Sequence, residues 1–204
     1  MMKLYSSVFW IVFVKAKISP HLIFLTAGEL GIPQKSVITP MEMANIRKLE
    51  AQNAVKFLKA SLTILSFPDL HLPFIPIEDL VKAVMPIIRR KKTDAIFSFD
   101  PYETTTKFDH PDHNIAGVVA KYVGAAADVK NFMPEHKVLK QRPELYLWSS
   151  KQKPKNIMVK QTKKLKEQRS QYLLTHYPSQ FRKTEQKDWE KIFSKISENY
   201  EKVR

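Results

Sequence analysis

The sequence contains no cysteine. A disulfide framework and a thiolate zinc site are therefore excluded, and any bound metal must be held by His, Asp or Glu. The lack of cysteine is consistent with a reducing compartment, and we predict a cytoplasmic location. The chain has 204 residues, of which 44% are hydrophobic and 11% aromatic, enough for a buried core. We therefore expect one domain over residues 1–204.

The sequence also lacks a long hydrophobic run. Its most apolar stretch, Val8 to Val14, holds seven residues, far fewer than the about 20 that a membrane-spanning helix needs. No small-residue cleavage site follows it, so a secretory signal is not indicated either. A DNA-binding motif is absent, and we expect no nucleic-acid partner.

Positive charge is abundant and unevenly placed. The net charge is +14, and residues 151–204 hold fifteen Lys plus Arg against six Asp plus Glu, a surplus of nine. We predict a basic helical tail over this range. Its charges either form a solvated helical face or contact an anionic partner such as a phospholipid or a sugar phosphate.

Short apolar runs alternate with helical patterns along the chain. Buried strands are predicted where β-forming residues are bounded by turn or acidic residues, at 21–26, 62–67, 94–100 and 144–149. Helices are predicted from apolar spacing and capping signals, at 39–60, 76–92 and 113–132, with two more in the tail at 162–177 and 185–203. This alternation predicts an α/β fold with a mostly parallel sheet flanked by helices and a C-terminal helical extension.

Polar residues follow each predicted strand. In open parallel sheets the ligand lies beyond the carboxyl ends of the strands. We therefore expect one crevice to be lined by a set of polar side chains from these loops: Thr26, Glu29, Asp69, Asp100, His110, Asp112 and His113.

The stretch "HPDH" at 110–113 fits the start of a helix, because a proline is tolerated in the first turn and the helix dipole favours Asp112 there. His110 would precede the helix and His113 would lie on its first turn. One imidazole could then bind a metal and the other donate a proton, with Asp112 orienting a histidine. The alternative is a capping or surface role. The other histidines (His21, His71, His136 and His176) lack supporting context and are interpreted as structural or surface residues, and Asp100 and Glu103 as ordinary loop acids.

Five segments resemble, in order and spacing, the PIG-L/LmbE-like family of zinc-dependent N-deacetylases: "LIFLTAGELG", "TPMEMANIRKLEAQNAVKFL", "LSFPDLHL", "DAIFSFDP" and "HPDHNIAG". The resemblance covers roughly 20–150, and "HYPSQ" at 176–180 is a looser match. It implies a Rossmann-like fold and removal of an acetyl group from an N-acetylglucosamine-type sugar conjugate. Zinc would polarise the acetyl carbonyl and activate water.

The resemblance also implies roles for individual residues. His113 resembles the family's C-terminal zinc ligand, and His110 the histidine that assists the tetrahedral intermediate and the leaving amine. Asp112 would partner His110 through a hydrogen bond. Arg47 and Asp69 match substrate-binding positions of the family's pocket, where side chains contact the substrate or shape the site, although helix spacing also allows an ion pair of Arg47 with Glu42 or Glu50.

The family's His-Pro-Asp-Asp-Glu motif, which supplies two zinc ligands and the catalytic base, does not occur in these 204 residues. Its expected place is at or just before Met1, so we expect an N-terminally incomplete core over 15–150, from a truncated or wrongly started chain. Glu29, Asp69 or Asp100 could replace the missing ligands, without support from spacing. A catalytic zinc normally has three protein ligands, so impaired hydrolysis is predicted. The alternative is a non-catalytic relative that binds a glycan or an anionic head group.

Overall fold

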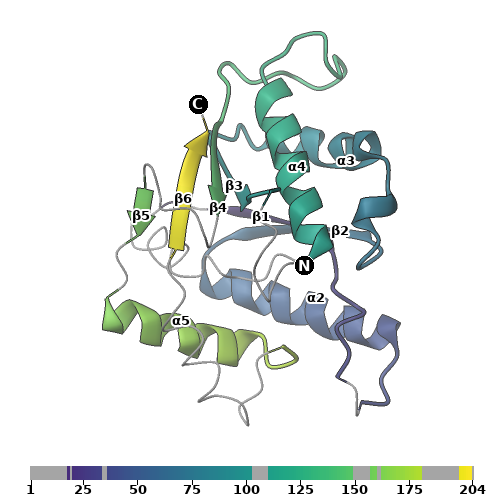
Figure 1. Ribbon diagram of the computed structural model, residues 1–204, viewed down its shortest axis with the longest axis vertical. Helices are drawn as coiled ribbons and strands as arrows, with labels where there is room; N and C mark the ends of the chain where they lie inside the picture. The colour runs from purple at the N-terminus through teal and green to yellow at the C-terminus, as the bar shows by residue number, and fades with distance from the viewer. Residues whose placement is uncertain are drawn as a thin grey trace. The chain divides into compact units, whose positions relative to one another are not determined.

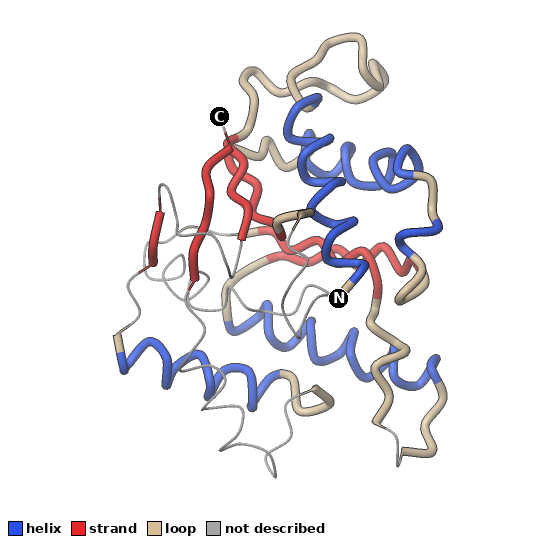
Figure 2. Tube along the Cα trace, in the orientation of Figure 1, coloured by secondary structure: helices blue, strands red, loops and turns tan. Residues whose placement is uncertain are grey.

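The computed structural model describes residues 18, 20–33, 36–102, 110–148, 157–159, 162–180 and 198–203. The chain divides into two compact units, shown by their elements in Figures 1 and 2: Met1–Asp69 with Val159–Glu198, and Leu70–Met158 with Asn199–Arg204. The single domain over 1–204 stays a prediction. Our expectations for the apolar run at 8–14 and for Glu103 lie outside the described residues.

The first unit contains a parallel pair of strands, β1 (His21–Thr26) and β2 (Ser61–Phe67). Their register runs from His21 opposite Ser61 to Phe24 opposite Ile64, and it shifts before Thr26 pairs with Phe67. Helix α2 (Pro40–Phe57) connects them. Both strands lie within one residue of their predicted positions.

Helix α2 begins where its capping signals predict. The Thr39 hydroxyl accepts a hydrogen bond from the Glu42 amide, and the Glu42 carboxylate accepts one from the Thr39 amide at 2.7 Å. This reciprocal arrangement satisfies two of the backbone donors that a helix start leaves free. Helix α5 (Lys163–His176) starts similarly, with the Thr162 hydroxyl accepting from the Leu165 amide.

The core of the first unit lies between β1, α2 and α5, and the two helices run side by side in Figure 1. Burial of these apolar side chains is the main force holding the unit together. The largest ones come from all three elements and from the C-cap residues of the two helices: Leu22, Phe24, Val55, Leu58, Tyr172, Leu173, Leu174 and Tyr177.

The second unit begins with a short 3₁₀ turn, η1 (Leu72–Phe74), followed by α3 (Ile77–Arg90) and β3 (Ala95–Phe99). Helix α4 (Pro111–Ala126) then leads toward β4 (Glu144–Trp148), which pairs in parallel with β3. Figure 2 shows α3 and α4 as neighbouring helices, and the two are in contact.

Gly117 allows α4 to approach β3 closely. A Cβ atom at this position would lie 2.4 Å from the Phe99 carbonyl oxygen, so no larger residue fits without displacing the backbone. The helix start that carries the predicted histidines is thereby held against the end of β3.

The end of the chain differs from the prediction. Residues Glu198–Val203 form strand β6, which pairs antiparallel with β4, so the helix predicted over 185–203 is wrong for this segment; 185–197 lie outside the described residues. The exposed edge of β4 offers backbone donors and acceptors that outweigh a weak helical preference. Strand β5 (Ile157–Val159), also unpredicted, completes the order β3-β4-β6-β5. The mostly parallel α/β class is confirmed, and α5 confirms part of the helical extension.

Among the described helices, none has both the length and the apolar composition needed to cross a bilayer.

Candidate functional site

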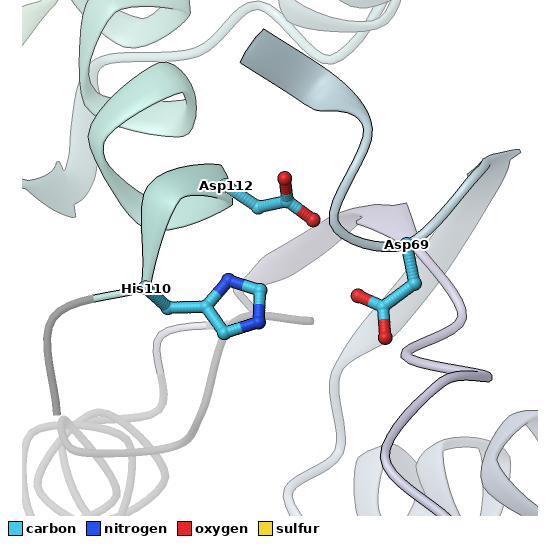
Figure 3. A group of neighbouring side chains, drawn as sticks. All are labelled: Asp69, His110 and Asp112. Carbon is cyan, nitrogen blue, oxygen red and sulfur yellow. The ribbon is translucent and has the colours of Figure 1, made fainter.

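The start of α4 has the local structure that "HPDH" predicts. His110 is the N-cap, with extended backbone angles of φ −119° and ψ 124°, and the helix begins at Pro111. The His113 amide donates to the His110 carbonyl oxygen at 2.8 Å. Figure 3 shows the His110 side chain just before the helix and the Asp112 side chain on its first turn. The sequence therefore correctly predicts that His110 and Asp112 lie at the start of this helix.

The structure brings the two predicted histidines together. The ring centroids of His110 and His113 are 5.0 Å apart. The His113 ring is 6% exposed and stacks on Phe99, with centroids 4.1 Å apart and ring planes 3° from parallel. Because Phe99 is the last residue of β3, His113 lies at the carboxyl end of that strand, where ligands of open α/β sheets bind.

Asp112 is almost completely buried, with 2% of its surface exposed. Its carboxylate accepts hydrogen bonds from the Leu70 amide at 2.7 Å and the Leu72 amide at 3.2 Å. In the part of the chain that the structure describes, these hydrogen bonds go to backbone amides rather than to His110, although a carboxylate oxygen lies within 4.8 Å of a His110 ring nitrogen. Asp112 thus fixes the segment after β2 to the start of α4.

The donor atoms at the start of α4 suit zinc. Imidazole nitrogens from His110 and His113 and a carboxylate oxygen from Asp112 are ligand types that zinc accepts when no thiolate is present. A His110 ring nitrogen and an Asp112 carboxylate oxygen are close enough to bind the same ion. Because Asp112 and His113 are buried, such a site would be partly shielded from water. The residues present therefore fit the metal that the resemblance implies.

Polar side chains also meet after β1 in the first unit. The Asp69 carboxylate, 4% exposed, accepts from the Thr26 hydroxyl at 3.3 Å and from the Leu30 amide at 3.2 Å. The Asp69 amide donates to the Glu29 carboxylate at 2.8 Å. Three residues expected at the strand ends are thus in direct contact. Asp69, also labelled in Figure 3, directly precedes Leu70 in the chain.

Arg47 is buried on α2, with 8% of its surface exposed. Its Nη1 donates to the Gly28 carbonyl oxygen, and its Nη2 donates to the Gly31 carbonyl oxygen at 2.8 Å. Burial lowers the pKa of Arg47, and the carboxylates of Asp69, Glu50 and Glu29 oppose this shift. Through its two carbonyl contacts, the Arg47 guanidinium binds the loop after β1.

The ion pair of Arg47 with Glu42 or Glu50, which helix spacing allowed, does not form. Glu42 is held by the cap of α2. The Glu50 carboxylate accepts hydrogen bonds from both the Ser179 amide, at 2.7 Å, and the Ser179 hydroxyl, at 2.6 Å. Sequence reasoning missed this contact, and the only signal for it was the loose "HYPSQ" match.

The remaining candidates have local roles. Asp100 accepts a hydrogen bond from the Tyr102 amide at 2.9 Å, as an ordinary loop acid does. His21 contacts the hydroxyls of two β2 residues, Ser61 and Thr63. His176 packs against the rings of Phe57 and Tyr172, and burial lowers its pKa. The Nε2 atom of His136 lies 3.8 Å from a carboxylate oxygen of the neighbouring Glu135, and His71 directly precedes η1.

Several solved structures share this fold. N,N′-diacetylchitobiose deacetylase from Pyrococcus horikoshii is 19% identical, with a TM-score of 0.81 over 98% of this chain and 78% of the other. The 4-carboxy-2-hydroxymuconate hydratase GalB from Pseudomonas putida KT2440 is 14% identical, with a TM-score of 0.73 over 98% and 90%. A triple-mutant deacetylase of the teicoplanin biosynthetic pathway is 13% identical, with a TM-score of 0.66 over 97% and 90%. At these identities the likeness shows the fold alone.

No curated protein matches the chain. The family model PIG-L, described as GlcNAc-PI de-N-acetylase, matches residues 10–123. This range is more than half of the chain, and it contains the capped helix α2, the loop after β2 and the histidine-bearing start of α4. The chain therefore belongs to the PIG-L family.

Proposed function

We propose that the chain is a hydrolase that removes the acetyl group from an N-acetylglucosamine-type sugar conjugate, with zinc as its metal. The observation that carries this proposal is the pair of adjacent imidazoles, His110 and His113, at the end of β3 within the matched family segment. Fold likeness contributes less, because the similar structures include a hydratase as well as deacetylases.

Each residue at the start of α4 has a proposed role. His113 holds the metal, with its ring orientation fixed by stacking on Phe99. When bound, zinc polarises the acetyl carbonyl and lowers the pKa of a coordinated water. His110, less buried and beside His113, donates a proton to the leaving amine nitrogen as the C–N bond breaks. Asp112 holds the helix start in place through the Leu70 and Leu72 amides.

We further propose that these 204 residues hydrolyse such substrates weakly. The resemblance assigns two zinc ligands and the general base to a His-Pro-Asp-Asp-Glu motif that this sequence does not contain. Catalytic zinc normally takes three protein ligands, and water activation needs a base. The expected partner is a small N-acetylated sugar conjugate, and the cytoplasmic location stays a prediction from the cysteine-free sequence.

Zinc titration by calorimetry and acetate release from N-acetylglucosamine derivatives test this proposal. The informative variant is His113→Phe, which keeps a ring to stack on Phe99 and removes the nitrogen donors. We expect weak zinc binding by the parent chain and at least a tenfold further loss in this variant, or about 1.4 kcal/mol. His136→Phe, at a histidine far along the sequence from α4's start, is the matched control. Unchanged zinc affinity in His113→Phe would contradict the ligand role, and fast turnover by the parent chain would contradict the proposed impairment.

A second candidate function is non-catalytic binding of a glycan or an anionic head group. The positive surplus of the tail favours it, and Lys163 and Lys164 are exposed at the start of α5. Exposed charge pairs weaken strongly as salt is raised. Binding that needs no zinc and weakens with salt would support this alternative over hydrolysis.

A further inference from the structure

We propose that the exposed face of α2 is an interaction surface for a second copy of this chain, in an antiparallel helix pair whose twofold axis passes beside Leu49. The surface belongs to the first unit and includes none of the residues to which the proposed function gives a role. Helix α2 runs unbroken from Pro40 to Phe57 (Figure 1), a length of about 27 Å. The inference is independent of the proposed function.

The first support is an apolar stripe along α2. Four large apolar side chains of this helix are exposed to solvent: Ile46 at 39%, Leu49 and Phe57 at 59% and Met41 at 73%. Ile46 and Leu49 are neighbours on the helix surface, because residues three positions apart lie side by side. The Phe57 ring is held by the α5 rings of Tyr172 and His176, with centroids 5.5 and 5.2 Å away. Exposed apolar stripes with polar neighbours mark surfaces that contact a partner.

A second support is that this face is electrically neutral on a strongly basic chain. From Met41 to Phe57, the other exposed residues are three uncharged amides, one acid and one base: Asn45, Gln52, Asn53, Glu42 and Lys56. The whole chain carries a net charge of +14, so two copies repel each other wherever they meet through surfaces that share this excess. A neutral face is where a second copy approaches with least repulsion.

The identities of these residues also suit pairing of the helix with itself. In an antiparallel pair with its axis at Leu49, residues equally far before and after Leu49 lie level with each other on the two copies. Glu42 and Lys56, each seven positions from Leu49, therefore lie level with each other at both ends of the pair. Asn45 and Asn53, each four positions away, bring together two amides that both donate and accept hydrogen bonds. A parallel pair would instead set like charges side by side, so charge selects the antiparallel one.

A second copy fits this face better than a membrane surface does. Helices that lie on anionic membranes carry several basic residues beside their apolar face, whereas the single exposed base here, Lys56, is matched by Glu42. One helix face is small beside the roughly 1,200–2,000 Å² that stable interfaces bury in total. We therefore expect a reversible dimer with a dissociation constant on the order of 10 μM.

The cysteine-free sequence makes the geometry directly testable by cross-linking the full chain. Leu49→Cys places one thiol at the twofold axis beside its own counterpart, whereas the two thiols of a Met41→Cys pair lie about 24 Å apart along the helices. With copper phenanthroline and oxygen as oxidant, Leu49→Cys at about 100 μM should form at least about tenfold more disulfide-linked dimer. Met41 is the more exposed position, so reactivity alone favours the opposite result. Equal cross-linking of the two variants, or none in either, would overturn the proposal.

Sedimentation velocity tests the charge pairs on the reduced, cysteine-free chain. Lys56→Glu sets two acids level with each other at both ends of the pair and should weaken dimerisation about tenfold. Adding Glu42→Gln, which keeps an oxygen acceptor for the cap of α2, should recover about threefold of this loss. Lys140→Glu, at an exposed position of the second unit, makes the same charge change and should not weaken dimerisation.

Two outcomes of sedimentation would overturn the proposal. One is a loss in Lys56→Glu no larger than that in Lys140→Glu. The other is a parent chain that stays monomeric at about 500 μM, which would leave a different protein or a lipid surface as the occupant of this face. All these substitutions are at exposed positions, so circular dichroism should show the parent's helix content and Tm within about 2 °C in each variant.

Discussion

Among the residues whose burial the structure describes, each unit buries one arginine, and the two arginines use their charge differently. In the second unit, Arg89 is 3% exposed and donates all five of its N–H groups to backbone carbonyl oxygens, those of Ala126, Ala127, Val129, Met133 and His136. In the first unit, Arg47 donates to two carbonyl oxygens, and its Nε has no hydrogen-bond partner among the described residues. Neither guanidinium forms an ion pair within the part of the chain that the structure describes.

The surroundings explain the difference. The acceptors of Arg89 include the last carbonyls of α4, which carry the negative end of the helix dipole, so they complement a positive charge without a carboxylate. Arg89 therefore caps the C-terminal end of α4, and His113 lies at the other end of this helix. Arg47 instead lies among titratable carboxylates and binds a loop at a strand end. The two arginines therefore differ in how fully backbone carbonyl oxygens satisfy their N–H groups: every N–H group of Arg89 has such an acceptor, whereas the Nε of Arg47 has none among the described residues.

The largest effect should come from Arg89→Met. This change removes the guanidinium donors from five carbonyl oxygens, four of which keep a hydrogen bond from a backbone amide, and we expect the free energy of unfolding to fall by about 2–3 kcal/mol. Urea denaturation measures it. The control is Arg90→Met at the exposed neighbouring position, which should change stability by less than about 0.5 kcal/mol. An effect at Arg89 no larger than at Arg90 would remove the contrast between the two buried arginines.

A smaller effect should come from Ser179→Ala, which tests the hydrogen bonds of Glu50, the α2 carboxylate three residues after Arg47. The variant removes the hydroxyl donor to Glu50 and keeps the backbone donor. We expect a loss of about 1 kcal/mol in the free energy of unfolding, because one of two hydrogen bonds to a buried charge remains. In the double variant Ser179→Ala with Glu50→Gln, the loss in the free energy of unfolding, measured by urea denaturation, should be smaller than the sum of the two single losses. Full additivity would show that the two residues act independently.

The smallest effect concerns the pH dependence of stability. It should come from His176, a histidine of the first unit, whereas the carbonyl acceptors of Arg89 in the second unit do not titrate. Burial lowers the pKa of His176 in the folded chain below its ordinary value of 6.5. As pH falls below about 6.5, the unfolded chain takes up this proton first, so stability decreases until pH passes the folded pKa. Tm measured from pH 7.5 to 5 should fall less steeply in His176→Gln than in the parent. Equal slopes would assign the pH dependence to other groups.

Local signals in the sequence predicted many of these features. Thr39, Pro40 and Glu42 specify the start of α2, and the proline and acid of "HPDH" specify the start of α4, because capping depends on a few adjacent residues. Alternating strand and helix patterns gave four strands within one residue of their observed ends. The helix predicted over 185–203 is wrong at 198–203, because pairing with the edge of β4 is a long-range contact that local preference does not report.

The sequence by itself determined the order of the elements from β1 to β4, the helix caps and the identity of the side chains at the start of α4, since these follow from propensity and spacing along the chain. Only the tertiary structure decided the partners of the buried charges: Arg47 with the carbonyls after β1, Glu50 with Ser179, and Asp112 with the amides after β2. A buried charged group must satisfy its donors and acceptors with whichever groups the fold brings near it, and those groups lie up to 129 positions away in the chain.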